Sequence, residues 1–335
     1  MADTQAKYHH LIPQTYMAAW AHGNGTLYIK YLQSEKIEER NKENIAGINH
    51  YHSIVAGMVI CTKEDTDILF APVSSYVVIY EGTVVVDTLE LNKIYYDFDN
   101  WQISRPDGTP ISKKKIESEI DKIKIRDIEE NWSVKYENKW NVVRKQIEKI
   151  ILSAQRDSVP AFQKDYLMKF YTALDWRSIK SNIQFNDAFN WFCKDIMELD
   201  DIDIPESERY LKMNSSAADE MRHCLLLKFY RSFLDETGLI NKNADANNQH
   251  TSFHFLVADG AEYFITSDNP AFIHKREDGG LVGILPITPR ILMCQGKMTE
   301  DDGNYYITHI TDGAVHKYNK AIRENSNEFI ILNRI

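Results

Sequence analysis

The chain has 335 residues, of which 43% are hydrophobic and 11% are aromatic, and its formal net charge is −10. This apolar content suffices for one large domain or for two lobes, and it excludes a chain that is disordered throughout. An excess of acidic residues disfavours a protein that binds long nucleic acid through counterion release. A small ligand, a short nucleic acid, or a protein partner bound through the acidic surface remains open.

Neither a membrane segment nor an export signal is expected. The apolar runs are far shorter than the roughly 20 residues that a membrane helix needs. Residues 1–7 are polar and lack the apolar core of a signal peptide, which predicts a cytoplasmic protein without membrane contact. The cysteines are too far apart for metal-knuckle or redox spacing and are expected to be reduced thiols: they are Cys61, Cys193, Cys224 and Cys294.

Residues 1–55 are predicted to form an N-terminal motif unit. Pro13 stands where a first helical turn would begin, and aromatic residues follow it at helical spacing. The Gly-Asn-Gly turn that comes next leads into an expected strand over residues 26–32, and a looser extended segment follows over residues 45–54.

Residues 56–110 are predicted to be a β-rich insertion, because short runs rich in Val, Ile and Tyr recur between turn signals. The expected strands cover residues 58–61, 67–70, 76–80, 83–89 and 94–98.

Residues 111–240 change to helical periodicity and are predicted to form a helical layer. The expected helices cover residues 112–132, 135–156, 161–176, 186–199 and 215–234. Gly238 is expected to end the last of them, and the acidic stretch 198–208 is expected to be a surface connector.

Residues 241–335 return to strand patterns and are predicted to form a C-terminal β-rich segment. The expected strands cover residues 252–257, 262–266, 281–285, 291–295, 305–310 and 328–332, with a helix over residues 312–325. Strands, then helices, then strands indicate an α+β fold, here a single composite domain of 1–335.

Several patterns in chain order resemble a bacterial family catalogued as domain of unknown function 4238. The opening Tyr-His-His-Leu-Ile-Pro-Gln-Thr-Tyr-Met, residues 8–17, carries the first signature, and Gly-Thr-Leu-Tyr-Ile, residues 25–29, resembles the strand that follows. Residues 264–270 and 285–289, Phe-Ile-Thr-Ser-Asp-Asn-Pro and Leu-Pro-Ile-Thr-Pro, resemble its closing pattern. The resemblance implies a shared fold and shared site positions, and it implies no reaction.

The paired histidines His9 and His10 precede the proline that starts the first expected helix. Two imidazoles there could hold a phosphate or carboxylate, or ligate a metal ion. The structural alternative is that one histidine caps the helix while the other faces solvent. Gln14, inside the same signature, is a candidate for substrate binding.

The turn after residue 266 concentrates short polar side chains at the end of an expected strand. Asp268 could be a metal ligand or a general base, with Ser267 and Asn269 orienting a substrate. The structural alternative is a turn in which these side chains bond to their own backbone, with Pro270 fixing the exit.

We therefore predict one composite site in which the two motifs face each other, with His10 and Asp268 as catalytic groups. Arg156, from the helical layer, would add positive charge. Such a set suits metal-assisted or acid/base hydrolysis of a phosphate-containing small molecule or nucleic-acid end, with a divalent metal as a candidate cofactor. A role as a toxin or an antiviral effector is a further hypothesis for a hydrolase of this kind.

Two other functions remain open. The order His10, Asn41 and His50, or His10, Asn44 and His52, roughly imitates a His-Asn-His metal-dependent nuclease, in which a histidine activates water beside one metal ion. The rival from a different class is a non-enzymatic sensor or interaction subunit whose acidic surface meets a basic partner.

Overall fold

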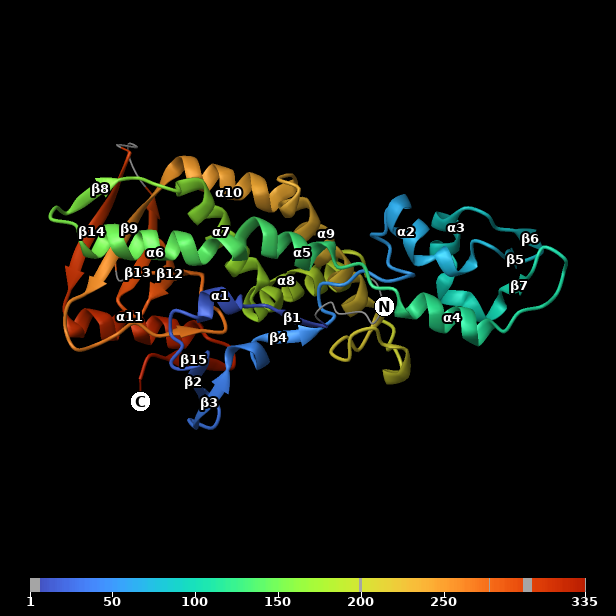
Figure 1. The fold of residues 1–335 in the computed structure, drawn as a ribbon, viewed down its shortest axis with the longest axis horizontal. Coiled ribbons are helices and arrows are strands. Elements are labelled where there is room, and N and C mark those ends of the chain that lie inside the picture. The colour runs from blue at the N-terminus through green and yellow to red at the C-terminus, as the bar shows by residue number, and fades with distance from the viewer. Residues whose placement is uncertain (1–6, 199–200, 277, 298–302, 335) are drawn as a thin grey trace. The chain divides into compact units, whose positions relative to one another are not determined.

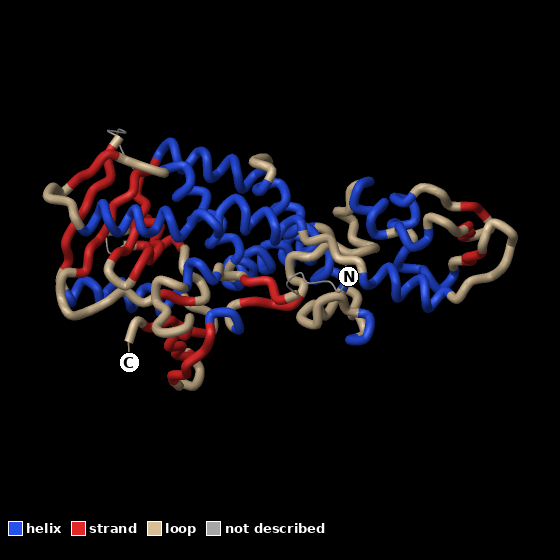
Figure 2. The backbone as a smooth tube through the Cα atoms, viewed as in Figure 1, coloured by secondary structure: helices blue, strands red, loops and turns tan. Residues whose placement is uncertain are grey.

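The computed structural model describes residues 7–198, 201–276, 278–297 and 303–334. The fold is α+β, as the order of sequence patterns predicts, with strands and helices distributed along the chain (Figures 1 and 2). The chain divides into two compact units. Unit 1 contains Met1–Asn49, Trp132–Glu198 and Ser232–Ile335, and unit 2 contains His50–Asn131 and Leu199–Arg231.

The largest element of unit 1 is a six-stranded sheet in the order β11-β12-β13-β9-β14-β8. Its strands are antiparallel to their neighbours except for β9 and β14, which run parallel. Their bounds are β8 Ser158–Pro160, β9 Thr251–Ala258, β11 Phe272–Lys275, β12 Leu281–Thr288, β13 Ile291–Lys297 and β14 Asn304–Ile310. The central strands read as nearly continuous apolar runs because both faces of the sheet are covered.

Two helices cover the opposite faces of this sheet. Helix α11, Asp312–Asn325, packs its apolar side against one face, where Val315 and Ile322 join a core that contains Leu256 and Ile284. Helix α7, Lys164–Arg177, lies against the other face, because the Tyr171 hydroxyl comes close to Gly283 of β12. The contact with Gly283 therefore places the middle of α7 against β12, and Figure 1 shows the helices and the sheet of unit 1.

Two smaller sheets carry the ends of the chain in unit 1. In the first, β1 pairs with β4, and in the second the order is β10-β15-β2-β3. Segments from both ends of the chain thus share one sheet, since β15 pairs with both β10 and β2. The bounds are β1 Tyr8–His10, β2 Thr26–Tyr31, β3 Ile37–Asn41, β4 Gly47–Asn49, β10 Thr266–Ser267 and β15 Phe329–Leu332.

The remaining helices of unit 1 are mostly amphipathic or buried. Two of them border π-helical turns, Ser133–Glu137 before α6 and Phe192–Ile196 after α8. Their bounds are α1 Gln14–Met17, α6 Asn138–Leu152, α8 Ile179–Trp191 and α10 Gly238–His250. Helix α9, Ala217–Leu234, begins in unit 2 and ends in unit 1.

Unit 2 has a core of its own, built from helices and one small sheet of order β6-β5-β7. Phe70, Trp101 and Ile116 are among its buried members. Helix α2 begins with a capping box between Thr62 and Asp65, which satisfies two backbone N–H groups. The bounds are α2 Lys63–Leu69, α3 Thr88–Lys93, α4 Lys113–Lys122, α5 Asp127–Trp132, β5 Val77–Tyr80, β6 Thr83–Val84 and β7 Gln102–Ser104.

Several sequence-based boundaries were wrong. Residues 67–70, expected as a strand, belong mainly to α2, and residues 94–98 lie mostly in a 3₁₀ segment. The helix expected over 112–132 is interrupted, because the backbone of Ile125 pairs with Ile54 instead. Such pairing with a distant segment has no local signal.

The C-terminal half brings two further corrections. Gly238 was expected to end a helix, but it is the first residue of α10, a helix that the sequence reading missed. Of the strand expected over residues 262–266, only Thr266 lies in a strand, the two-residue β10, Thr266–Ser267. In contrast, the helix expected over residues 312–325 has those bounds in the structure.

Candidate functional site

His9 and His10 lie on strand β1, which pairs with β4 so that His9 is opposite Ile48 and His10 is opposite Gly47. His9 is fully buried, and His10 is half-buried. The helix after Pro13 has only four residues and no side-chain cap. Strand pairing therefore positions the two histidines. Neither of them caps helix α1, which begins after Pro13, with a side-chain hydrogen bond.

The His10 imidazole takes part in a short polar chain at the edge of unit 1. Its Nε2 atom lies 3.2 Å from the Glu43 carbonyl oxygen and 3.3 Å from Nε2 of Gln14. Gln14 in turn accepts a hydrogen bond of 3.3 Å from Nζ of Lys42. The two candidate residues of the opening motif, His10 and Gln14, are thus in contact, with a lysine ammonium beside them.

Arg177, the last residue of α7, connects the helical layer to β1. Its guanidinium donates to the backbone carbonyl of His10 and, over 2.6 Å, to Oε1 of Glu137. It also stacks on the Trp132 ring at 4.9 Å, and its side chain is only 1% exposed. A buried arginine that is paired and hydrogen-bonded in this way holds its neighbours in a fixed geometry.

Asp268 fixes the backbone between α11 and β15. Its carboxylate accepts hydrogen bonds from the N–H groups of Asn327 at 2.9 Å, Glu328 at 2.6 Å and Phe329 at 3.4 Å. The side chain is buried, and this burial raises its pKa, although the three donors act in the opposite direction. Asp268 is therefore a capping group for the start of β15, in addition to any chemical role.

Ser267 and Asn269 form the turn that their residue types favour. The Asn269 N–H donates to Oγ of Ser267 at 3.1 Å, and Nδ2 of Asn269 donates to the Asn325 carbonyl at 3.2 Å. Both side chains are buried, and Oδ1 of Asn269 has no hydrogen-bond partner among the residues that the structure describes. An orphaned buried acceptor of this kind calls for an explanation.

The two sequence motifs do meet in space, through aromatic residues. The Tyr16 hydroxyl bonds to Oγ1 of Thr266 and donates to the Pro286 carbonyl, both at 2.8 Å. The Trp20 indole N–H donates to the Phe264 carbonyl at 2.9 Å. These buried bonds join α1 and the turn after it to residues 264–266 and to β12. The His10 and Asp268 side chains are held by different partners.

The junction of α7 and α8, which we call the α7–α8 corner, lies next to both motifs. It comprises Tyr171, Asp175, Arg177, Ser178, Lys180 and Ser181. Arg177 contacts the opening motif, as described above. Lys180 donates to the Glu324 carbonyl at 3.3 Å, and its ammonium interacts electrostatically with the Asp268 carboxylate. Burial lowers the pKa of Lys180, and Asp268 opposes that shift.

Asp175 is the carboxylic acid of this corner. Its Oδ1 accepts a hydrogen bond of 3.1 Å from Oγ of Ser181, and burial raises its pKa to about 6. The buried Tyr171 hydroxyl lies on the same helix and has no hydrogen-bond partner within the described ranges. Gly283 leaves room for that hydroxyl, because a Cβ atom there would stand 2.9 Å from it. Perturbed acids beside orphaned polar atoms are typical of functional sites.

The sequence reading missed Asp175 and Lys180. The available signal was a charged residue directly after the apolar run of α7, in Phe-Tyr-Thr-Ala-Leu-Asp. Arg156, chosen instead, is exposed in the turn that follows α6. Asn41 caps a 3₁₀ turn by accepting from the Glu43 N–H at 2.9 Å, and Asn44 is exposed.

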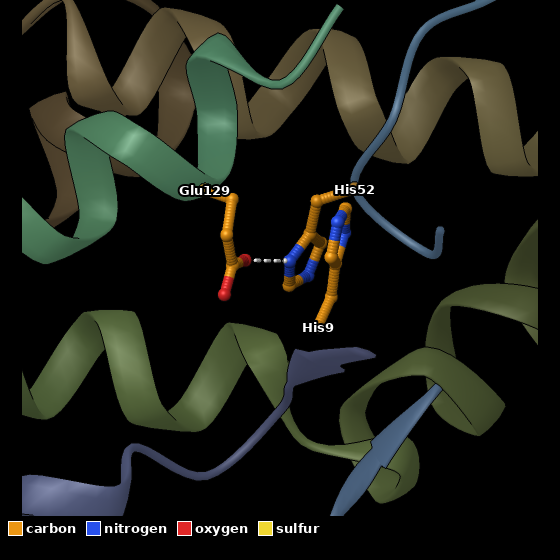
Figure 3. Close-up of side chains that lie close together, drawn as sticks. All are labelled: His9, His52 and Glu129. Atoms are coloured by element: carbon orange, nitrogen blue, oxygen red, sulfur yellow. Dashed lines mark hydrogen bonds and ion pairs between the residues drawn. The ribbon is translucent and has the colours of Figure 1, made fainter. Parts of the chain in front are cut away.

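Unit 2 holds a second group of titratable residues. Nδ1 of His52 lies 2.6 Å from Oε2 of Glu129, at the first turn of α5 (Figure 3). The Tyr51 and Tyr230 rings meet His52 edge-on, at centroid distances of 5.3 and 5.6 Å. Nε2 of His223 donates to the Tyr51 carbonyl at 2.9 Å, and burial lowers the pKa of His223 to about 3, which favours its neutral form.

These features define a protein of the mixed α+β class, with a polar corner in one unit and a buried histidine–carboxylate pair in the other. A family model described as protein of unknown function, DUF4238, matches residues 8–334, and the chain belongs to that family. Comparisons with curated proteins and with solved structures find no match. Within the described ranges, every helix is too short or too polar to span a lipid bilayer.

Proposed function

We propose that the chain is a hydrolase of a phosphate-containing small molecule or nucleic-acid end, with its active site at the α7–α8 corner. The observation that carries this proposal is the Asp175 carboxyl group, which interacts electrostatically with the buried Tyr171 hydroxyl. Its near neighbours along the chain, Arg177 and Lys180, reach the His10 carbonyl and the Asp268 carboxylate. A partly desolvated acid among convergent polar groups is the expected composition of an acid/base site.

Asp175 is the general base in this proposal, and Lys180 is the cation. Asp175 removes a proton from water while the water oxygen bonds to phosphorus and the bond to the leaving oxygen breaks. His10 returns a proton to that leaving oxygen. A base whose pKa lies near the operating pH is effective in both halves of such a cycle. The Lys180 ammonium would stabilise negative charge on the phosphoryl oxygens.

The other candidate residues orient the substrate in this proposal. His9 and Gln14 shape the side near β1, and the turn formed by Ser267 and Asn269 shapes the side near Asp268. Asp268 acts mainly by holding the backbone at the start of β15. Lys180 takes the role of positive charge from the helical layer that the sequence assigned to Arg156.

The test is hydrolysis by wild type and by Asp175→Asn of a panel of phosphomonoesters, nucleotides and short single-stranded oligonucleotides. We expect wild type to hydrolyse one of these classes and Asp175→Asn to lower kcat about 100-fold or more, the usual contribution of a general base. Thermal unfolding should show that the variant is at least as stable as wild type, because Asn keeps the hydrogen bond from Ser181.

Asp187→Asn is the matched control, since Asp187 is an exposed acid of the neighbouring helix α8. It should leave hydrolysis unchanged. Full activity in Asp175→Asn, or no hydrolysis of any panel member by wild type, would overturn the proposal.

A second candidate function rests on a different observation. The end of α8 and the π-helical turn after it expose large apolar side chains, with Trp191 58%, Phe192 47% and Ile196 53% exposed. The acidic residues Asp195 and Glu198 are exposed in the same segment. An apolar surface with an acidic rim, in a chain of net charge −10, fits a partner that presents a basic, amphipathic helix.

A further inference from the structure

We propose that His52 and Glu129 are ligands of a transition-metal ion of the zinc class, bound within unit 2. This site is independent of the α7–α8 corner and of the hydrolase proposal. An imidazole nitrogen and a carboxylate oxygen are a donor set for zinc, cobalt or manganese, whereas magnesium and calcium prefer oxygen donors alone.

The geometry suits two adjacent ligands of one ion. The ligand atoms of His52 and Glu129 lie well within 4.8 Å of each other, and Nδ1 of His52 and Oε2 of Glu129 are 2.6 Å apart. Two ligands at roughly 2.0–2.1 Å from a tetrahedral ion stand about 3.3 Å apart, farther than the present hydrogen-bonding distance. A small rotation of either side chain would therefore admit an ion between them. Figure 3 shows the two groups pointing toward each other from separate segments.

The surroundings favour the exclusion of bulk water. His52 has no exposed surface, and the Glu129 side chain is 19% exposed. The Tyr51 and Tyr230 rings pack edge-on against the imidazole. A partly buried carboxylate in such an environment is stabilised by a nearby cation.

The two ligands come from distant parts of the sequence. His52 lies in the loop after β4, whereas Glu129 lies in α5, 77 residues later. An ion shared by both would hold this loop against the first turn of α5, next to the backbone pairing of Ile54 with Ile125. The role that follows is a clamp between the loop that carries His52 and helix α5, with further donors or bound water completing the coordination of the ion.

The experiment is titration of chelator-treated, full-length protein with Co²⁺ and Zn²⁺. We expect one equivalent of Co²⁺ to give the visible absorption of a bound ion, and Zn²⁺ to displace it and to raise Tm. His52→Gln and Glu129→Gln should each weaken Co²⁺ binding at least tenfold, the lower end of what losing even a supporting residue costs. Glu130→Gln, an exposed acid of the same helix, and His316→Gln, an exposed histidine, should bind as wild type does.

The proposal would be overturned if wild type bound no equivalent of Co²⁺, or if both ligand variants bound Co²⁺ as tightly as wild type does. If a ligand variant fails to fold, X-ray absorption spectroscopy of zinc-loaded wild type tests the proposal instead. The spectrum must show a nitrogen donor together with oxygen donors, and a shell of water alone would contradict the proposal. Hydrolysis by Asp175 would be unaffected by either outcome, which separates this site from the proposed function.

Discussion

At the scale of single residues, two aspartates of unit 1, the buried Asp268 and the half-buried Asp175, differ because their hydrogen-bond partners differ. Asp268 accepts three backbone hydrogen bonds, which favour its ionised form and offset much of the cost of burial. Asp175 accepts one hydrogen bond, from Ser181, and burial raises its pKa to about 6. Asp268 is thus suited to holding backbone, whereas Asp175 is suited to exchanging a proton.

This difference predicts that the Asp175 carboxyl group makes the free energy of unfolding depend on pH. The folded state binds the proton more tightly than the unfolded state, whose pKa is 3.8. The contribution of Asp175 to stability is therefore fully present below pH 4, and it is lost as the pH rises to about 6. The full shift corresponds to roughly 3 kcal/mol, and residual solvent contact reduces it.

Asp175→Asn should show this effect directly. Its free energy of unfolding should match that of wild type near pH 4 and exceed it by about 1–3 kcal/mol at pH 7. Urea unfolding at a series of pH values measures the difference. A difference that does not change with pH would show that the Asp175 carboxyl titrates normally.

At the scale of elements, the opening motif depends on the pairing of two very short strands. Each of β1 and β4 has three residues, and they stay together because the backbones approach closely at Gly47. The Gly47 N–H donates to the Tyr8 hydroxyl at 3.0 Å, and a Cβ atom on Gly47 would lie 2.7 Å from the His9 carbonyl oxygen. The position of His10 is therefore set by a residue 37 places later in the sequence.

Gly47→Ala should lower the free energy of unfolding by about 1–3 kcal/mol, because the methyl group overlaps backbone atoms and the strands must separate. The control is Gly313→Ala in the first turn of α11, where a Cβ atom meets nothing within 4 Å. Gly313→Ala should be neutral or stabilising by up to about 1 kcal/mol. Chemical denaturation measures both, and equal effects would contradict the role given to Gly47.

At the scale of the whole molecule, the chain contains two compact units and carries a net charge of −10. Each unit has its own buried core, and the segment that leaves unit 1 after α8 is both apolar and exposed. Large exposed aromatic side chains are uncommon on surfaces without a partner, and they are frequent anchors at interfaces.

A labelled amphipathic helix of Lys and Leu should therefore bind wild type in fluorescence anisotropy, and its affinity should fall with added salt. The double variant Trp191→Ser, Ile196→Ser should bind at least tenfold more weakly, because both apolar anchors are lost. A matched Glu and Leu helix is the control and should not bind. If both helices bound equally well, or if the double variant bound as wild type does, the proposal of an interaction surface at this segment would be wrong.

The sequence alone determined the features that depend on neighbouring residues. The bounds of α11 and the core strands β9, β12 and β13 follow from local periodicity, and the ordered motifs over residues 8–17 and 264–289 indicate the family. The polar turn at residues 267–269 likewise follows from the residue types, because Ser, Asp and Asn bond to nearby backbone.

Only the tertiary structure decided which polar groups meet. Tyr16 joins Thr266 across 250 residues, and Arg177 joins His10 across 167, through contacts that no local pattern encodes. The raised pKa of Asp175 and the pairing of His52 with Glu129 likewise arise from burial among distant segments. Secondary structure depends on interactions within a few residues, whereas the electrostatics of a site depend on the side chains that the fold brings around it.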